Sequence, residues 1–467
     1  MSPLDAPKTL KVDNSVSLSI EDGSCRIVDG RPATARRKNA KSHCCGLSSK
    51  RESKSNYQID LYAILNAHIA DNGLTISYVD GDGNNATVNA VQYSVRQEEK
   101  SHAESWAKYF MDRAYGQAQP FKRLKVVINP FCGRAVTNFR THAAPIFAAA
   151  HCQVDVEETK YRGHAIEIAE KIDLDAYDAI VCCSGDGLPH EVFNGLAARS
   201  DAVMALKSMA VAMVPCGSGN AMAWNVFGTD NPALAALGIV KGLELPLDIA
   251  SITQGDRHTV SFLSQSLGVL ADSDLKTDHL RWMGDHRFIY GVISTIIQKT
   301  AYPCEIALKT STDDGEESQG QSSGTTNGLP LKYGTVLDDI PGDWEIVPRE
   351  KLASFYASNM KIVAKDTNFF PAALPRDGVL DVMMIDDTVG YAGALDAIIK
   401  LPQGKCDELK DVEMRKIAAY RLTPWKQEGY ISVDGERYPF EPFQVEVHRG
   451  LGRVLSKSNH SYQIPGV

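Results

Sequence analysis

The sequence lacks the features that mark several common classes of protein. No apolar run reaches the roughly 18 residues that a membrane-spanning helix needs. The N-terminus has no charged segment followed by an apolar core, so no signal peptide is expected. The formal net charge of −9 argues against general nucleic-acid binding. Neither the Walker A loop nor the His-Arg-Asp and Asp-Phe-Gly motifs of protein kinases occur.

Paired cysteine spacings of the kind that bind zinc are also missing. The ten cysteines are scattered, and the adjacent Cys182 and Cys183 lie in an apolar run, where they act as small buried hydrophobic residues. This pattern indicates a reduced, intracellular protein. With 467 residues, 43% of them hydrophobic, the chain can bury a large core, and its length predicts two or three domains.

Three loops that each follow an apolar strand are the strongest functional signal. The first is Asn129-Pro130-Phe131-Cys132-Gly133-Arg134, the second is Ser184-Gly185-Asp186-Gly187, and the third is Gly217-Ser218-Gly219-Asn220. Glycine lets an anionic ligand approach the backbone, and the helix behind the third loop has an N-terminus that favours an anion. Ligands of open α/β sheets bind at the carboxyl ends of strands, so we expect one phosphate-handling cleft. Asp186 could instead cap the helix that follows it.

The order of these motifs, with Leu188-Pro189-His190-Glu191-Val192-Phe193-Asn194-Gly195-Leu196 after the second loop, resembles the diacylglycerol-kinase catalytic superfamily. Within it the chain is most similar to sphingoid long-chain-base (sphingosine) kinases, over residues 122–455. The resemblance implies an α/β lobe with a parallel sheet, of the diacylglycerol-kinase and phosphofructokinase type, and an antiparallel β-sandwich lobe, with the cleft between them. It also implies ATP and Mg²⁺ as cofactors and a sphingoid base as the lipid substrate, phosphorylated on its primary hydroxyl.

The resemblance assigns roles to individual residues. Asp186 matches the general base, Ser264 a serine that binds the lipid hydroxyl, and Asp274 the acid that faces the lipid amine. Glu191 could be a helix cap or an ion-pair residue. Mg²⁺ ligands stay open, with Asp186 and Glu436 as candidates. The positions matched to the nucleotide are Asn129, Gly133, Arg134, Thr159, Ser184, Gly185, Gly187, Gly217, Ser218, Gly219, Arg281, Arg287, Asp434, Gly435 and Glu436; His164 lies in the same motif as Thr159.

One departure from the family pattern keeps an alternative open. Cys132 and Ala135 stand where the family usually has glycine, and their β-carbons could narrow the nucleotide loop. A catalytically weak lipid-binding scaffold is therefore one alternative. Ceramide or diacylglycerol kinase activity is another, although a carboxylate such as Asp274 suits a cationic amino-alcohol and not a neutral lipid. A kinase of a soluble metabolite such as NAD would have no use for the Ser264–Asp274 block.

The segment before residue 56 has its own character. Residues 1–55 are predicted to be a disordered basic tail, in which eight Lys and Arg between Arg31 and Lys54 face a single acid, Glu52. Such an island is attracted to anionic lipid, and acylation of Cys44 and Cys45 would add a second anchoring signal. The expected location is cytoplasmic, with peripheral association to intracellular or plasma membranes.

The remaining periodicities predict a small β-rich, pleckstrin-homology-like module at 56–118, the nucleotide-binding lobe at 120–250 and the β-sandwich lobe at 251–460, with a flexible insertion at 311–330. The hydrophobic patterns predict strands and helices as follows: strands 57–61, 74–79, 86–95, 125–128, 153–157, 179–183, 211–214, 259–265, 302–309, 354–362, 416–422, 430–433 and 443–447; helices 137–150, 164–172, 189–199, 220–227, 232–241 and 391–401.

Overall fold

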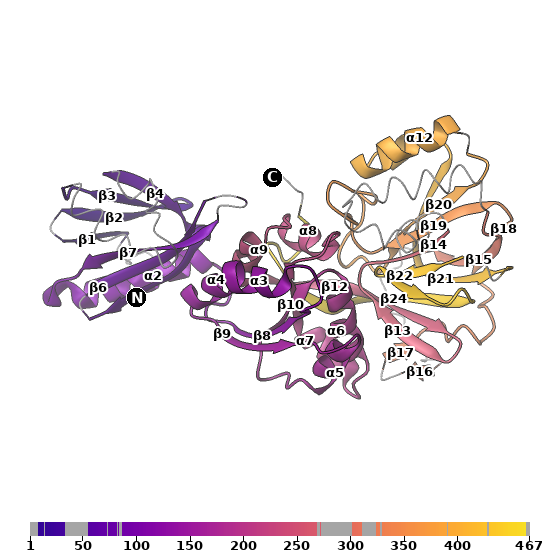
Figure 1. Cartoon of the computed structure of the whole chain (residues 1–467), viewed down its shortest axis with the longest axis horizontal. Coiled ribbons are helices and arrows are strands. Elements are labelled where there is room, and N and C mark those ends of the chain that lie inside the picture. The colour runs from indigo at the N-terminus through magenta and orange to yellow at the C-terminus, as the bar shows by residue number, and fades with distance from the viewer. Residues whose placement is uncertain are drawn as a thin grey trace. The chain divides into compact units, whose positions relative to one another are not determined.

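The computed structural model describes residues 8–13, 15–32, 55–71, 73–81, 83, 86–268, 271, 301–310, 324–326, 329–389, 391–426 and 429–463. The chain divides into two compact units (Figure 1). Unit 1 comprises Met1–Leu124, Val136–Asp155 and Asn231–Leu243, and unit 2 comprises Lys125–Ala135, Val156–Asp230 and Glu244–Val467.

Unit 1 begins with two small antiparallel sheets and a helix. The elements are β1 (Thr9–Val12), β2 (Val16–Glu21), β3 (Ser24–Asp29) and β4 (Asn56–Asp60) in the first sheet, the 3-10 helix η1 (Leu61–Ala63), β5 (Ile64–Ala70), β6 (Gly73–Asp80) and β7 (Thr87–Ser94) in the second sheet, the 3-10 helix η3 (Gln97–Glu99), and helix α2 (Lys100–Tyr115). Helix α2 buries Trp106 and Phe110, whose rings stack 4.8 Å apart.

The prediction of a disordered tail over residues 1–55 was wrong for β1 to β3. Leu10 and Val12 alternate with exposed residues, and Val16 and Leu18 alternate with partly exposed residues on the paired strand. The side chain of Arg31, counted in the basic island, binds Asp29 at 2.7 Å and Asp13 at 3.1 Å. The period-two pattern that marks a strand is present in these segments, and the prediction missed it because it rested on the composition of residues 1–55 as a whole.

Two buried lysines join helix ends within unit 1. Helix α9 (Pro232–Val240) ends next to Lys241, whose Nζ donates to the carbonyl of Ala114 at 3.0 Å and lies 3.6 Å from the centre of the Tyr115 ring. Lys122 Nζ donates in turn to the carbonyl of Val240 at 2.9 Å. Each lysine therefore satisfies a carbonyl at the C-terminus of a helix, where positive charge is favourable.

The predicted nucleotide-binding lobe is built on a parallel sheet. Its strands run in the order β24 (Phe443–Ser456), β11 (Ala210–Pro215), β10 (Ala179–Ser184), β8 (Arg123–Ile128) and β9 (Gln153–Glu158). The helical segments are α3 (Ala135–Asn138), a π-helical turn η4 (Phe139–Ala143), α4 (Ala144–Ala149), α5 (His164–Lys171), α6 (Gly187–Ala197), α7 (Ala202–Ser208) and α8 (Ala221–Phe227). Strands β10 and β11 pair in parallel and are buried at every position, as expected of central strands covered on both faces.

The second part of unit 2 is antiparallel. Its strands are β12 (Leu243–Gln254), β13 (Arg257–Ser261), β14 (Ser264–Gly268), β15 (Cys304–Thr310), β16 (Gly324–Thr326), β17 (Leu329–Leu331), β18 (Glu345–Arg349), β19 (Leu352–Ser358), β20 (Leu380–Asp386), β21 (Val412–Pro424), β22 (Ile431–Val433) and β23 (Glu436–Tyr438). Helix α12 (Tyr391–Lys400) and the 3-10 helices η6 (Leu401–Gln403) and η7 (Cys406–Glu408) lie between β20 and β21 in the chain. Of the predicted insertion at 311–330, residues 311–323, 327 and 328 lie outside the described residues.

One strand belongs to both sheets. At its start β24 pairs antiparallel with β21, where Ala419 lies opposite Glu446, and further along it pairs parallel with β11, where Val211 lies opposite Val454. The parallel and antiparallel parts are thus one continuous hydrogen-bonded sheet. The predicted fold class is confirmed, and the shared strand is the feature that the sequence patterns missed.

Candidate active site

The second and third glycine loops cross at Gly185 and Gly217. A β-carbon built on Gly217 would lie 2.6 Å from the Gly185 α-carbon, so no side chain fits there. The Asn220 side chain closes the third loop by accepting from the Gly217 N–H and donating to the Gly217 carbonyl, each at 2.9 Å. Asn220 adopts a left-handed backbone, with φ of 51°, which asparagine tolerates better than most residues. The close approach of the two backbones therefore requires glycine at 217 and leaves little room at 185, where a β-carbon would lie 3.3 Å from the Gly217 α-carbon.

The Asp186 carboxylate joins these two loops. Its Oδ2 accepts from the Ala221 N–H and its Oδ1 from the Met222 N–H, each at 3.0 Å. Burial raises the pKa of Asp186, while these two hydrogen bonds lower it and the Asp434 carboxylate raises it. Asp186 caps helix α8 instead of α6, which follows it directly. The anion that we expected at the start of this helix is therefore the protein's own carboxylate.

The first loop packs against the third. Asn129 donates its N–H to the Cys183 carbonyl at 3.2 Å, and its side chain accepts from the Phe131 N–H at 3.0 Å. Gly133 has a φ of +46°, and the Cys132 sulfur lies 3.7 Å from the Cys216 carbonyl oxygen. The positive φ falls at the glycine that the sequence retains. Cys132 therefore introduces a side chain without straining the backbone.

The same is true of Ala135, the other residue that replaces a family glycine. Ala135 is buried at the start of α3 and has no positive φ. Arg134 precedes it on the same loop. The two departures from the family pattern are accommodated by the local backbone.

Asp434 was predicted to bind nucleotide, but in the structure its carboxylate accepts hydrogen bonds from the protein itself. The side chain is fully buried and accepts from the Ser261 hydroxyl at 2.6 Å and from His190 Nδ1 at 2.8 Å. It also accepts from the backbone N–H groups of Phe262, Leu263 and Ser264 at 2.9–3.2 Å. With five donors around it, this carboxylate holds the β13–β14 turn against helix α6.

Glu436, two residues further on, lies at the second loop. A β-carbon on Gly187 would lie 2.9 Å from Glu436 Oε1, so the carboxylate rests directly over this glycine. Glu436 also forms an ion pair with Arg162, and its side chain keeps 34% of its surface exposed. Gly435, between the two acids, has a φ of +82° and makes the turn of the hairpin.

Glu191, on helix α6, caps the N-terminus of helix α5. Its carboxylate accepts from the Gly163 N–H at 2.9 Å and the Ala165 N–H at 3.1 Å. Thr159, at the end of β9, is buried and donates its N–H to the Ile128 carbonyl at 2.8 Å. Of the two predicted roles for Glu191, the structure therefore selects the cap. This cap fixes the segment that contains Thr159 and His164.

Strand β14 begins at Ser264, the predicted lipid-binding serine. Its hydroxyl accepts from the Tyr356 hydroxyl at 3.2 Å, and its N–H donates to Asp434. Asp434 therefore connects the predicted lipid serine to helix α6, which begins at Gly187. Tyr356 was not predicted from sequence, because its role depends on the pairing of β14 with β19.

Other predicted residues cannot be placed. Asp274, Arg281 and Arg287, and also Cys44 and Cys45, lie outside the described residues. Within the parts of the chain that the structure describes, no group of three or more His, Cys, Asp or Glu residues is arranged to hold a metal ion.

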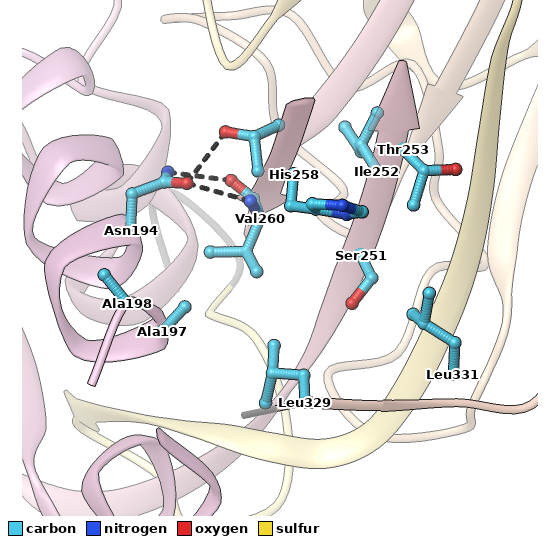
Figure 2. Close-up of a pocket in the computed structure, with 11 residues that line it drawn as sticks. Asn194, Ala197, Ala198, Ser251, Ile252, Thr253, His258, Val260, Leu329 and Leu331 are labelled. Carbon is cyan, nitrogen blue, oxygen red and sulfur yellow. Dashed lines mark hydrogen bonds between the residues drawn. The ribbon is translucent and has the colours of Figure 1, made fainter. Parts of the chain in front are cut away.

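A separate pocket with polar and apolar lining residues lies between α6 and the strands β12, β13 and β17 (Figure 2). Asn194 forms one wall and is held by β13, because its side chain accepts from the Thr259 hydroxyl at 2.8 Å and the Val260 N–H at 2.9 Å. None of the predicted nucleotide or lipid residues lines this pocket. Asn194 therefore fastens α6 to the antiparallel part of the sheet.

Known proteins share this fold. Residues 123–252 match the diacylglycerol kinase catalytic domain, and residues 8–116 match a domain of unknown function, DUF7493. A crystal structure of a diacylglycerol kinase from Bacillus anthracis str. Sterne superposes with a TM-score of 0.50 at 19% identity, over 72% of this chain and 98% of that one. The fold is that of the diacylglycerol-kinase type.

Sequence relatives narrow the class. The chain is 34% identical over 419 residues to sphingoid long chain base kinase 5 of Saccharomyces cerevisiae, covering 74% of this chain and 61% of that protein. It is 32% identical over 397 residues to sphingoid long chain base kinase 4 of Schizosaccharomyces pombe, covering 82% and 84%. It is 33% identical over 389 residues to sphingosine kinase 1 of Arabidopsis thaliana, covering 75% and 78%. The chain belongs to the sphingoid long-chain-base kinase family.

Proposed function

We propose that this protein transfers the γ-phosphate of ATP to the primary hydroxyl of a sphingoid long-chain base and releases the 1-phosphate. The observation that carries the proposal is the Asp186 carboxylate, held by two backbone N–H groups beside the crossing of two glycine loops. Membership of the family supports the choice of lipid class.

The residues present fit a nucleotide. The crossing of Gly185 and Gly217 excludes side chains, so the loops offer backbone groups, and oriented backbone N–H groups bind phosphates. ATP, when bound, supplies the phosphoryl group. The residues that we assign to it are Asn129, Gly133, Arg134, Thr159, Ser184, Gly185, Gly187, Gly217, Ser218, Gly219, Gly435 and Glu436, with Arg281 and Arg287 proposed from sequence alone.

A magnesium ion fits beside Glu436. Mg²⁺ in kinases is usually held by one or two carboxylates together with the substrate phosphates and water, so a cluster of three acids is not required. The partly exposed Glu436 carboxylate over Gly187 suits this task. Asp434 does not, because its five donors occupy the carboxylate completely.

Asp186 accepts the proton of the lipid hydroxyl. The two N–H groups fix the orientation of the carboxylate. Gly219 leaves one side of it uncovered, because a β-carbon at this position would lie only 3.4 Å from Oδ2. Burial raises the pKa of Asp186 towards the operating pH, which improves a general base.

A lipid chain requires an apolar site, and we propose that it lies beside a cluster of apolar side chains on the face of the antiparallel sheet opposite the sandwich core. Phe370, Met383 and Leu401 are buried there, and partly buried residues such as Tyr356 and Phe369 pack against them. Tyr356 belongs to this cluster and also touches Ser264. The proposed head-group serine thus adjoins the apolar cluster. Asp274, proposed from sequence, would face the amine.

We infer that the protein is cytoplasmic and binds membranes peripherally. Among the described residues, no helix is both long and apolar enough to cross a bilayer. Arg31 is already paired with Asp29 and Asp13, but the basic residues between Arg36 and Lys54 would be attracted to anionic lipid.

Turnover with radiolabelled ATP on four lipids tests the proposal. We expect phosphorylation of sphinganine and phytosphingosine and none of ceramide or diacylglycerol. Asp186→Asn should lower turnover by about 10²–10⁴-fold, because it removes a general base, while the circular dichroism spectrum stays unchanged. Equal turnover on ceramide would favour the ceramide-kinase alternative. Lipid binding without turnover would favour the scaffold alternative.

A further inference from the structure

A row of buried hydroxyl groups lies on the face of the antiparallel sheet opposite the sandwich core, next to the apolar cluster. The pairing of β14 with β19 places Ser264 opposite Ser358, Ser266 opposite Tyr356 and Gly268 opposite Ser354. Paired residues of antiparallel strands point to the same face, and alternate residues share that face. The hydroxyls of β14 and β19 therefore lie together on one side of the sheet.

The character of this face changes at the next strand. Across β20, Tyr356 lies opposite Met383 and Ser354 opposite Ile385, and beyond them Met414 and Val412 continue the same rows on β21. These four apolar side chains belong to the cluster that we assign to the lipid chain. Polar and apolar groups thus meet along the line between β19 and β20.

Tyr356 lies at this boundary between polar and apolar side chains. Its ring packs against Phe369 and Phe370, at centroid distances of 5.9 Å and 5.7 Å, while its hydroxyl donates to Ser264. The hydroxyl is therefore held at the polar end of an otherwise apolar environment. Such a position serves a ligand that carries a polar group where its hydrocarbon chain begins.

Ser354 provides the independent observation. Its side chain is 3% exposed, and its hydroxyl has no hydrogen-bond partner within the described part of the chain. A buried hydroxyl without a partner is unfavourable, and a hydroxyl of a bound ligand can supply that partner. Its cross-strand neighbour Gly268 has no side chain to do so. Ser354 lies two residues before Tyr356 on the same face of β19. It is therefore about 7 Å further along the strand, on the side away from Ser264.

We propose that Tyr356 and Ser354 form a subsite that recognises a hydroxyl at the start of the lipid chain, so that the enzyme prefers a 4-hydroxylated base to one without that hydroxyl. This inference rests on the proposed function, since it presumes that the base lies with its head at Ser264. A site built to bind a hydroxyl rejects the analogue that lacks it, because its own polar groups are then left unpaired.

The test compares kcat/KM for phytosphingosine and sphinganine of equal chain length in mixed micelles. We expect the wild type to favour phytosphingosine, and both Tyr356→Phe and Ser354→Ala to lower this ratio by about three- to tenfold, the value of one neutral hydrogen bond. Ser354→Ala should leave the melting temperature unchanged or raise it. Tyr420→Phe is the matched control, because its hydroxyl bonds Gln265 inside the sandwich, and its ratio should equal that of the wild type.

The outcomes separate this inference from the proposed function. Turnover on both bases with an unchanged ratio in both variants would overturn the subsite alone. An equal loss on both bases in Tyr356→Phe would show that the tyrosine only positions Ser264. No turnover on either base in the wild type would overturn the proposed function and the subsite with it.

Discussion

Asp434 and Glu436 are two residues apart in one hairpin, yet they have opposite surroundings. Asp434 is buried with five donors, whereas Glu436 is partly exposed and pairs with Arg162. Asp434→Asn places an amide among groups that all donate, so we expect a loss of about 3–5 kcal/mol in the free energy of unfolding. Glu436→Gln should leave stability almost unchanged and raise KM for ATP. Thermal melts and kinetics of the two variants, measured side by side, check both expectations.

An unchanged melting temperature in Asp434→Asn, together with a raised KM for ATP, would instead make it a nucleotide ligand, as its motif suggested. Sequence alone could not distinguish the two acids. The partners of Asp434 are His190, 244 residues away, and Ser261, 173 residues away, and no local pattern encodes such distances. The sequence predicted that the glycine loops at 185 and 217 lie at one site, but it assigned their glycines to the approach of a ligand and did not predict that the two backbones cross.

Among the elements, the helix junction held by Lys122 and Lys241 has a pH-dependent consequence. The pKa of Lys241 is lowered to about 7, mainly by burial and also by the nearby Lys122, while Asp60 acts in the opposite direction. Unfolded lysine titrates near 10.4, so between about pH 7 and 10 the unfolded chain binds the extra proton, and stability rises with pH in that range. Below pH 7 both states are protonated, and the contribution no longer changes.

Lys241→Met should abolish this rise. The difference in urea midpoint between wild type and variant, followed from pH 6 to 10, isolates Lys241, because the buried tyrosines and cysteines titrate equally in both proteins. The wild type should gain stability relative to the variant as the pH increases. A difference that stays flat over this range would mean that Lys241 remains charged against the Ala114 carbonyl and the Tyr115 ring.

Element prediction succeeded where the periodicity was strong. The buried runs at 179–183 and 211–214 match β10 and β11 to within a residue at each end, and the helices predicted at 164–172 and 232–241 match α5 and α9 equally well. The predicted strand 259–265 was wrong, because it is broken between β13 and β14. There the N–H groups of Phe262, Leu263 and Ser264 turn towards Asp434 instead of a neighbouring strand.

At the scale of the whole molecule, the proposal predicts how the protein is attached to a membrane. Replacing Cys44 and Cys45 with serine should move the protein from membrane to cytosol without lowering activity on detergent-dispersed lipid. One acyl chain binds only marginally, and adjacent cysteines permit two. Fractionation in low and high salt measures this, since salt screens the basic island within about a Debye length. Membrane retention of the double variant in high salt would place the anchor elsewhere.

The division of the chain could be predicted only in outline. The alternation of strands and helices after residue 120 indicated a parallel sheet followed by an antiparallel part, as found. That both parts share β24 was not predictable, because the pattern over 443–447 marks a short strand and gives no sign that it continues to Ser456 in a different sheet.

The shared strand also determines when the molecule can finish folding during synthesis. A ribosome delivers the chain from its N-terminus, and the glycine loops emerge long before β24, which borders β11, and before Asp434, which secures His190 across 244 residues. Until that late segment arrives, the nascent sheet has an open edge at β11, and such edges invite pairing with other chains. Contacts so distant in sequence also slow folding. This protein should therefore engage chaperones on the ribosome and become an enzyme only once its translation has passed β24.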